Sequence, residues 1–115
     1  MLIKHLTAEV VRLTIADGVS ISVGNLVGVS SGEAVLSDKD VLISVVGFAK
    51  SVQDGIVYVQ TEGKFANSDN GDNFWLGTNG ALVSSVPTTG MVQQVAKRVD
   101  SENILIDIDK TVIIL

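Results

Sequence analysis

The clearest structural signal in the chain is the segment VLISVVGFAKSVQDGIVYVQTEG, residues 41–63. It contains two runs rich in apolar and β-branched residues, 41–49 and 56–62, and such runs predict strands. Asp54–Gly55 lies between them, and this pair supplies the positive φ that a tight hairpin turn requires. The segment therefore predicts strands joined by a short turn.

Alternation of side chains supports individual strands. In the run 56–62, Val57 and Val59 share one face, while the residues between them share the other. In NILIDI, residues 103–108, Ile104 and Ile106 share one face in the same way. A period of two over several residues is typical of a strand that is buried on one side.

The same pattern recurs along the whole chain, and it predicts an all-β fold of about ten short strands, a small antiparallel β-barrel or β-sandwich. We interpret residues 1–115 as one β domain, in which residues 1–17 are an N-terminal arm or the first strand. The further predicted strands are 10–15, 19–23, 26–29, 73–77, 81–85, 91–99 and 111–115. The predicted turns include Asp17–Gly18, Ser31–Gly32, Asn70–Gly71, Asn79–Gly80 and Thr89–Gly90.

The first predicted strand is irregular. Its apolar residues change face at Val10–Val11, which indicates a bulge or bend, and a helix over residues 5–14 is the alternative.

Composition excludes several classes of function. The net charge is −5 and the eight basic residues are scattered, so the chain is not expected to bind nucleic acid. It has no cysteine and no apolar run long enough to cross a membrane, and we expect synthesis without an export signal. Hydrophobic residues make up 46% and charged residues 18%, with a mean hydropathy of +0.43. These values predict apolar surface that another chain covers.

Two segments are the best candidates for that surface. Residues 77–95 contain no charged residue, and charge is depleted in the cores of interfaces. The final run, residues 111–115, is apolar and needs a partner strand or a cover. The predicted interface residues are Trp75, Leu82, Val86, Pro87, Met91, Val112, Ile113, Ile114 and Leu115.

No catalytic, cofactor-binding or metal-binding residues are predicted, and we do not expect an enzyme. GVSSG, residues 28–32, matches the pattern of a hydrolase nucleophile at Ser30. The only histidine, His5, precedes it, and no helical pattern follows, so a turn is the better interpretation.

Three other groups have a plain structural interpretation beside a chemical one. The polar segment 67–73 holds oxygen ligands suited to Ca²⁺, but it lacks the spacing of a tight site and is expected to be a turn. Asp107 and Asp109 share a strand face and are expected to be solvated rather than to act as an acid–base pair. Of the neighbours Phe74 and Trp75, one is expected in the core and the other partly exposed.

A series of short motifs runs through the second half of the chain: FWLG (74–77), NGAL (79–82), PTTG (87–90), QQV (93–95) and ILIDI (104–108). Together they resemble the small β-structured accessory proteins of tailed-bacteriophage virions, namely capsid decoration or cement proteins and head-fibre base segments. The likeness extends over residues 18–109. Three positions depart from the family pattern, because Ala96 stands where a glycine is usual and Lys97–Arg98 replaces more neutral residues.

The resemblance implies a structural role on the exterior of a capsid. It implies a β-barrel or β-sandwich that is synthesised in the cytoplasm of a bacterial host and assembles as a homotrimer. Its partners would be copies of itself and the major capsid protein or another virion protein. The alternative is a tail-fibre or baseplate module that recognises a host-cell glycan, with Trp75 as the stacking residue.

Overall fold

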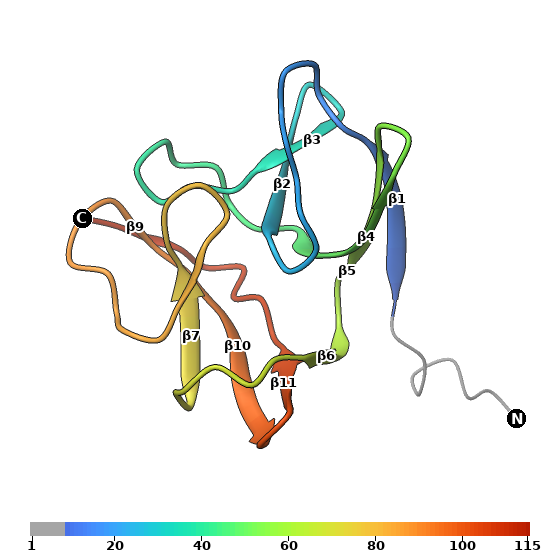
Figure 1. Ribbon diagram of the computed structural model, residues 1–115. Helices are drawn as coiled ribbons and strands as arrows, with labels where there is room; N and C mark the ends of the chain where they lie inside the picture. The colour runs from blue at the N-terminus through green and yellow to red at the C-terminus, as the bar shows by residue number, and fades with distance from the viewer. Residues whose placement is uncertain (1–8) are drawn as a thin grey trace, which may run out of the picture.

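The structure is a computed structural model that describes residues 9–115 (Figure 1). The described residues form twelve strands and no helix, and all paired strands are antiparallel, which confirms the all-β prediction. The strands are β1 (Val10–Thr14), β2 (Leu26–Ser30), β3 (Glu33–Leu36), β4 (Gly47–Gln53), β5 (Ile56–Gln60), β6 (Gly63–Ala66), β7 (Asn73–Leu76), β8 (Leu82–Val83), β9 (Met91–Val92), β10 (Gln94–Asp100), β11 (Asn103–Ile106) and β12 (Ile113–Ile114).

The first sheet has the order β1-β5-β4-β2-β3 and curls until its two edges meet. Ile15, just after β1, forms a parallel bridge with Ala34 of β3, and the Ala16 N–H donates to the Ala34 carbonyl at 3.0 Å. The inner face of this curled sheet holds a small core. Val57 and Val59 are fully buried in it, so the predicted alternation in β5 is confirmed for these two residues.

The second sheet has the order β6-β11-β10-β7-β8, and a two-stranded sheet, β12-β9, continues it at one end (Figure 1). Ile104 and Ile106 of β11 are buried, while Leu105 between them is exposed, as the alternation predicts. In β7 the Phe74 side chain is buried and Trp75 is partly exposed on the opposite face, which confirms the expectation for this pair.

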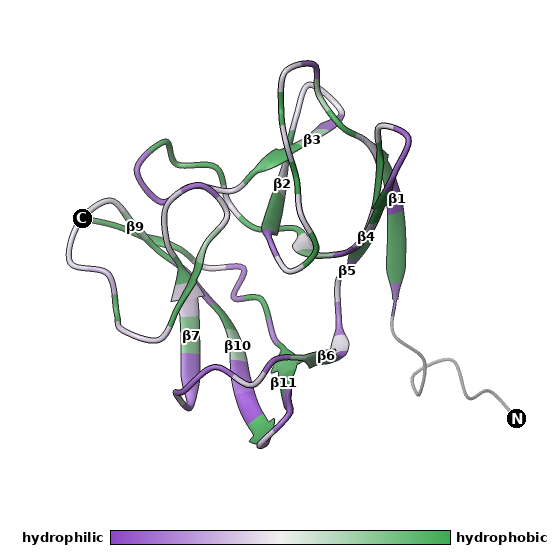
Figure 2. Cartoon of the chain, in the orientation of Figure 1, coloured by the Kyte–Doolittle hydropathy of each residue, from purple (hydrophilic) through white to green (hydrophobic). Residues whose placement is uncertain are grey.

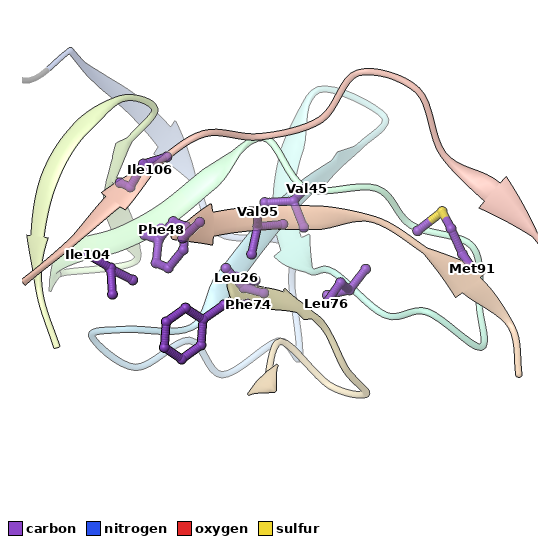
Figure 3. Packing of buried hydrophobic residues seen from close by; sticks show 10 residues of the cluster. Leu26, Val45, Phe48, Phe74, Leu76, Met91, Val95, Ile104 and Ile106 are labelled. Carbon is purple, nitrogen blue, oxygen red and sulfur yellow. The ribbon is translucent and has the colours of Figure 1, made fainter. Parts of the chain in front are cut away.

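A shared hydrophobic core joins the two sheets (Figure 3). Leu26, Val45 and Phe48 approach it from the first half of the chain, and Phe74, Val95 and their neighbours from the second. The Phe48 ring lies 5.1 Å from that of Phe65 on β6 in a tilted arrangement. Each fully buried side chain of this size stabilises the fold by about 1.5–3 kcal/mol, so the contact between the sheets is a main source of stability.

The predicted turns have the expected backbone. Asp54 and Gly55 have φ values of 52° and 75°, and Asn79 and Gly80 have 50° and 74°. Two successive positive φ values are what a hairpin turn of the I′ type needs, and Asp and Asn adopt them more readily than other non-glycine residues. These pairs therefore turn the chain where the sequence predicts.

Several predicted strands differ from the structure. The run 91–99 is divided at Gln93 into β9 and β10, which lie in different sheets, and in the run 111–115 only β12 is a strand. The run 41–49 is a strand only from Gly47 onward, because residues 38–43 form a loop closed by hydrogen bonds between the backbones of Asp38 and Ile43. The run 19–23 forms no strand, and in the run 81–85 only β8 does. Apolar alternation marks burial, but a strand also needs a neighbour with free backbone groups.

The start of the chain is described from Glu9. From Val10 to Thr14 the chain is strand β1, in continuous register with β5, so the helix alternative is wrong for these residues and no bulge interrupts them. The remainder of that prediction, with His5, lies outside the described residues. Within residues 9–115, no helix has the length and apolar character to span a membrane.

Candidate protein–protein interface

One end of the molecule gathers most of the strongly exposed apolar side chains in residues 9–115. Seven large apolar side chains of residues 9–115 are exposed by half or more, and six of the seven come from the loop after β3, the loop before β9 and the C-terminal segment. These three segments lie toward the end of the molecule marked C (Figure 2). We call these six residues the apolar end. They are Val41 (64% exposed), Leu42 (50%), Val86 (54%), Ile113 (60%), Ile114 (62%) and Leu115 (63%).

Backbone hydrogen bonds join the loop 38–43 and the C-terminal segment to Gly90 and Met91, which follow the Val86 loop. The Met91 N–H donates to the Lys39 carbonyl at 2.9 Å, which joins β9 to the loop 38–43. The Leu115 N–H donates to the Gly90 carbonyl at 2.8 Å, which joins the C-terminal segment to β9. Gly90 has a φ of +76°, and a Cβ there would lie 2.6 Å from the Lys39 carbonyl oxygen, so only glycine fits this junction.

The outer edge of β12 is open to a further strand. Met91 and Ile114 face each other across β9 and β12, and the Met91 N–H points away from β12 toward Lys39. The two therefore form the non-hydrogen-bonded kind of antiparallel pair, and the N–H and C=O of Ile114 point away from β9. No other strand of the described part of the chain pairs with β12.

Leu42 has an unusual backbone for its residue type. Its φ is 60°, in the left-handed region, where a side chain bearing a Cβ is disfavoured by about 1 kcal/mol or more. The conformation is set by the four-residue turn between Asp38 and Ile43, and it places an apolar side chain half in solvent. Strain of this kind persists only where the surrounding structure imposes it.

A groove lies beside the same loop. It has a volume of about 410 Å³ and its lining is mainly apolar. Val19, Val35, Leu36, Val41 and Ile43 supply the apolar lining. The apolar end thus combines a half-exposed leucine in a strained turn, an open strand edge and a neighbouring hollow.

The predicted interface residues divide into several groups. Four of them, Val86 and Ile113 to Leu115, are exposed at the apolar end, while Pro87 is half-buried in the loop that follows Val86. Leu82 and Val112 are half-buried and pack against the core. Met91 is only 2% exposed and belongs to the core, so its side chain is not part of the surface. Trp75 lies on the outer face of the second sheet, opposite Gln94 and Val83.

Sequence reasoning missed Val41 and Leu42, which it assigned to a strand. The charged pair Lys39–Asp40 directly before them was the available signal for a turn. The Lys39 side chain is held by the segment that contains Thr89. Its ammonium group donates to the Thr89 carbonyl oxygen at 3.1 Å and to the Thr89 hydroxyl oxygen at 3.0 Å. Such contacts between distant segments leave no local pattern in a sequence.

The polar segment 67–73 surrounds the positively charged side chain of Arg98. The Arg98 guanidinium donates to the carbonyl oxygens of Asn67, Asp69, Gly71 and Asn103, and to the Asn67 side-chain oxygen. It also lies 5.2 Å from the centre of the Phe74 ring, in a cation–π arrangement. No group of three or more metal-ligating side chains occurs within residues 9–115. The segment thus turns its backbone carbonyls and the Asn67 side-chain oxygen toward an arginine of the chain itself, while the Asp69 carboxylate accepts from the Asn67 side-chain amide at 3.2 Å.

Ser30 lies at the end of a strand, and Asp107 and Asp109 lie on the exposed segment that follows β11. Ser30 ends β2, and the turn at Ser31–Gly32 leads into strand β3, whereas a hydrolase nucleophile needs a helix there. Asp107 forms an ion pair with Lys97 at 3.3 Å, both side chains being well exposed, and Asp109 is exposed as well.

Comparison with protein-family models, with curated proteins and with solved structures finds no match to this chain. The resemblance to virion accessory proteins therefore stays a prediction.

Proposed function

We propose that this chain is a structural protein of a tailed-bacteriophage virion, either a capsid decoration or cement protein or the base of a head fibre. In this proposal it is made in the cytoplasm of the bacterial host and attaches to the exterior of the capsid as a homo-oligomer, for which the resemblance implies three copies. The observation that carries the proposal is the apolar end, where six strongly exposed aliphatic side chains gather.

The energetics of the apolar end favour repeated contacts over a single one. Covering a half-exposed aliphatic side chain stabilises a contact by about 1 kcal/mol, so the six supply about 6 kcal/mol from each chain, or about 12 kcal/mol where two apolar ends meet. Association costs about 4–15 kcal/mol in lost translational and rotational freedom, which is of the same size. A single pair of chains would therefore gain little net free energy, while a closed ring or a lattice, in which each chain makes several contacts, gains from avidity.

The partners in this proposal are other copies of the chain and the major capsid protein or another virion protein. The net charge of −5 and the scattered basic residues give no cationic patch for phosphate. Recognition of this kind rests on shape, apolar burial and backbone pairing.

The proposal is tested by measuring the solution mass of the chain by light scattering and by immunogold labelling of virions. The antibody is raised against the recombinant chain, and the virions come from the phage that encodes it. We expect a homo-oligomer and labels on the capsid. A monomer together with unlabelled capsids would contradict the proposal, and labels on the tail alone would place the chain in the alternative class.

One observation favours that alternative, recognition of a host-cell glycan by a tail-fibre or baseplate module. Trp75 is partly exposed on the outer face of the second sheet, beside Gln94, whose side-chain amide donates to the Asn73 oxygen at 3.1 Å. An indole next to amide groups suits a sugar ring. Because Trp75 is the chain's only tryptophan, its fluorescence reports binding directly. Trp75→Ala should abolish binding on a glycan array, while Leu105→Ala on the same sheet should not.

A further inference from the structure

We propose that the apolar end meets a second copy of this chain rather than the capsid shell, and that Leu42 projects from it into the neighbouring copy. This inference rests on the proposed function, because it names the surface through which the proposed oligomer forms. It leaves the other faces of the molecule for the shell.

The apolar end suits a copy of itself because it carries both a projection and a hollow. Leu42 projects from the loop 38–43, and the groove of about 410 Å³ lies beside the same loop. Near a symmetry axis, the projection of one copy faces the hollow of the next. The six side chains are uncharged, and the neighbouring Asp40 carboxylate is paired with the Lys39 ammonium at 2.9 Å, so this carboxylate would not be buried without a partner when copies meet.

Backbone groups give this contact a direction. The Ile114 N–H and C=O point outward from β12, as the pairing of Met91 with Ile114 requires. An open edge with β-branched side chains pairs readily with another strand. Side-chain burial and backbone pairing then act at the same place.

The conformation of Leu42 supports a covered state. In the free chain the residue is both backbone-strained, at a φ of 60°, and half exposed to water. Neither feature stabilises the free molecule, since glycine or asparagine would occupy the position with less strain. A neighbour that covers the side chain gives both features a role.

The size of the surface is adequate for a contact within an oligomer. Six side chains exposed by half or more present an apolar area on the order of 500 Å². A standard interface buries about 800 Å² on each partner, with a polar rim around an apolar centre. Thr88 and Thr89, both exposed beside the apolar end, are available for that rim.

The first test uses Leu42→Asn, which removes the apolar side chain and keeps a residue that tolerates a positive φ. The matched control is Val23→Asn, because Val23 is 65% exposed and lies outside the apolar end. We expect Leu42→Asn to weaken self-association by roughly tenfold or more in sedimentation velocity. Its resistance to urea as a monomer should equal or exceed that of the unmodified chain, so loss of association will not reflect unfolding. Val23→Asn should associate normally.

The second test uses single cysteines, since the chain has none of its own. Under mild oxidation, Ile114→Cys should form a disulfide-linked pair of chains, because the Ile114 residues of neighbouring copies lie close together. Val23→Cys, equally exposed, should stay monomeric on a non-reducing gel.

Failure of this inference can be told apart from failure of the proposed function. If the unmodified chain is an oligomer and labels the capsid, but neither Leu42→Asn nor Ile114→Cys behaves as expected, the copies meet elsewhere and the inference is overturned. If the chain is a monomer in solution and still labels the capsid, the apolar end faces the shell, which also overturns it. A monomer that labels no capsid overturns both.

Discussion

Strand β10 runs between two ends of the second sheet that differ in how their side chains are satisfied. At the Arg98 end, a loop rich in backbone and side-chain oxygens closes around a guanidinium of the same chain. At the Gln94 end, the chain leads back to β9 and to the apolar end, where aliphatic side chains stay half or more in solvent. One end satisfies its own polar groups, and the other leaves its aliphatic side chains exposed.

The comparison shows how a chain can separate stability from association. The guanidinium contributes to folding, because its partners lie on segments that it holds in place. The apolar end contributes little to the folding of a lone chain, because its side chains remain in water. Substitution of the exposed aliphatic side chains should therefore change association, whereas substitution of buried or hydrogen-bonded groups near either end should change the free energy of unfolding.

The largest expected effect is the loss of the Arg98 hydrogen bonds. Arg98→Leu should lower the free energy of unfolding by about 4 kcal/mol, since several charge-assisted bonds are lost and the loop oxygens lose their donor. Arg98→Lys should retain only a small part of the lost stability, because an ammonium group cannot donate to all of the same acceptors at once.

Arg12→Leu is the control, because Arg12 is exposed on β1, and it should change little. Urea denaturation measures all three. A loss below 1 kcal/mol for Arg98→Leu would show that the loop does not depend on the arginine.

The second effect concerns the junction that forms the apolar end. Gly90→Ala should destabilise the chain by about 2.5 kcal/mol, because the new Cβ meets the Lys39 carbonyl and the φ is +76°. Gly55→Ala, with a φ of +75° and open space around it, should cost only about 1 kcal/mol.

Both variants have the same backbone strain, so the difference between their free energies of unfolding measures the steric crowding at Gly90 alone. Gly90→Ala should also weaken self-association, while Gly55→Ala should not. Equal costs in urea would mean that the loop 38–43 yields easily to the added methyl group.

The third effect concerns Gln93, which is almost fully buried beneath the apolar end. Its side chain accepts from the Val45 N–H and donates to the Asp109 carbonyl, both at 2.9 Å. Gln93→Met should cost about 1.5 kcal/mol, because both buried backbone groups lose their partner. Gln94→Met, whose exposed bond to Asn73 is the only one lost, should be near neutral in the same denaturation series.

The smallest effect is a pH dependence at the Arg98 end. The Glu102 N–H and the Asn103 side chain donate to the Asp100 carboxylate and hold its pKa below the ordinary value of 3.8. A lowered pKa in the folded state gives stability above the unfolded-state pKa, and that stability is lost as pH falls through the folded-state value.

The unmodified chain should therefore lose more resistance to urea between pH 6 and pH 3 than Asp100→Asn does. Identical losses would show that this carboxylate contributes nothing measurable. The apolar end has no equivalent carboxylate among its six residues.

Local chemistry made the turns and the buried strand faces predictable from the sequence. Asp54–Gly55 and Asn79–Gly80 turn the chain because of backbone preferences that reside in those residues themselves. Val57, Ile104 and Ile106 are buried because alternation fixes the side of the sheet on which they lie.

Long-range contacts explain what the sequence could not predict. Val41 and Leu42 look like strand residues, since an apolar pattern does not distinguish a side chain that faces the core from one that faces outward. The hydrogen bonds of Arg98 could not be predicted from the sequence, because its acceptors lie up to 31 residues away along the chain. Met91 was predicted as surface for the converse reason, because an uncharged segment can turn inward as well as outward.

The apolar end exists only in the complete fold, because its three segments come from residues 41–42, residue 86 and residues 113–115. No linear peptide reproduces it, so short fragments of the chain should be poor competitors for whatever binds there. An antibody that recognises this surface would be conformational, and it would separate native from heat-treated protein.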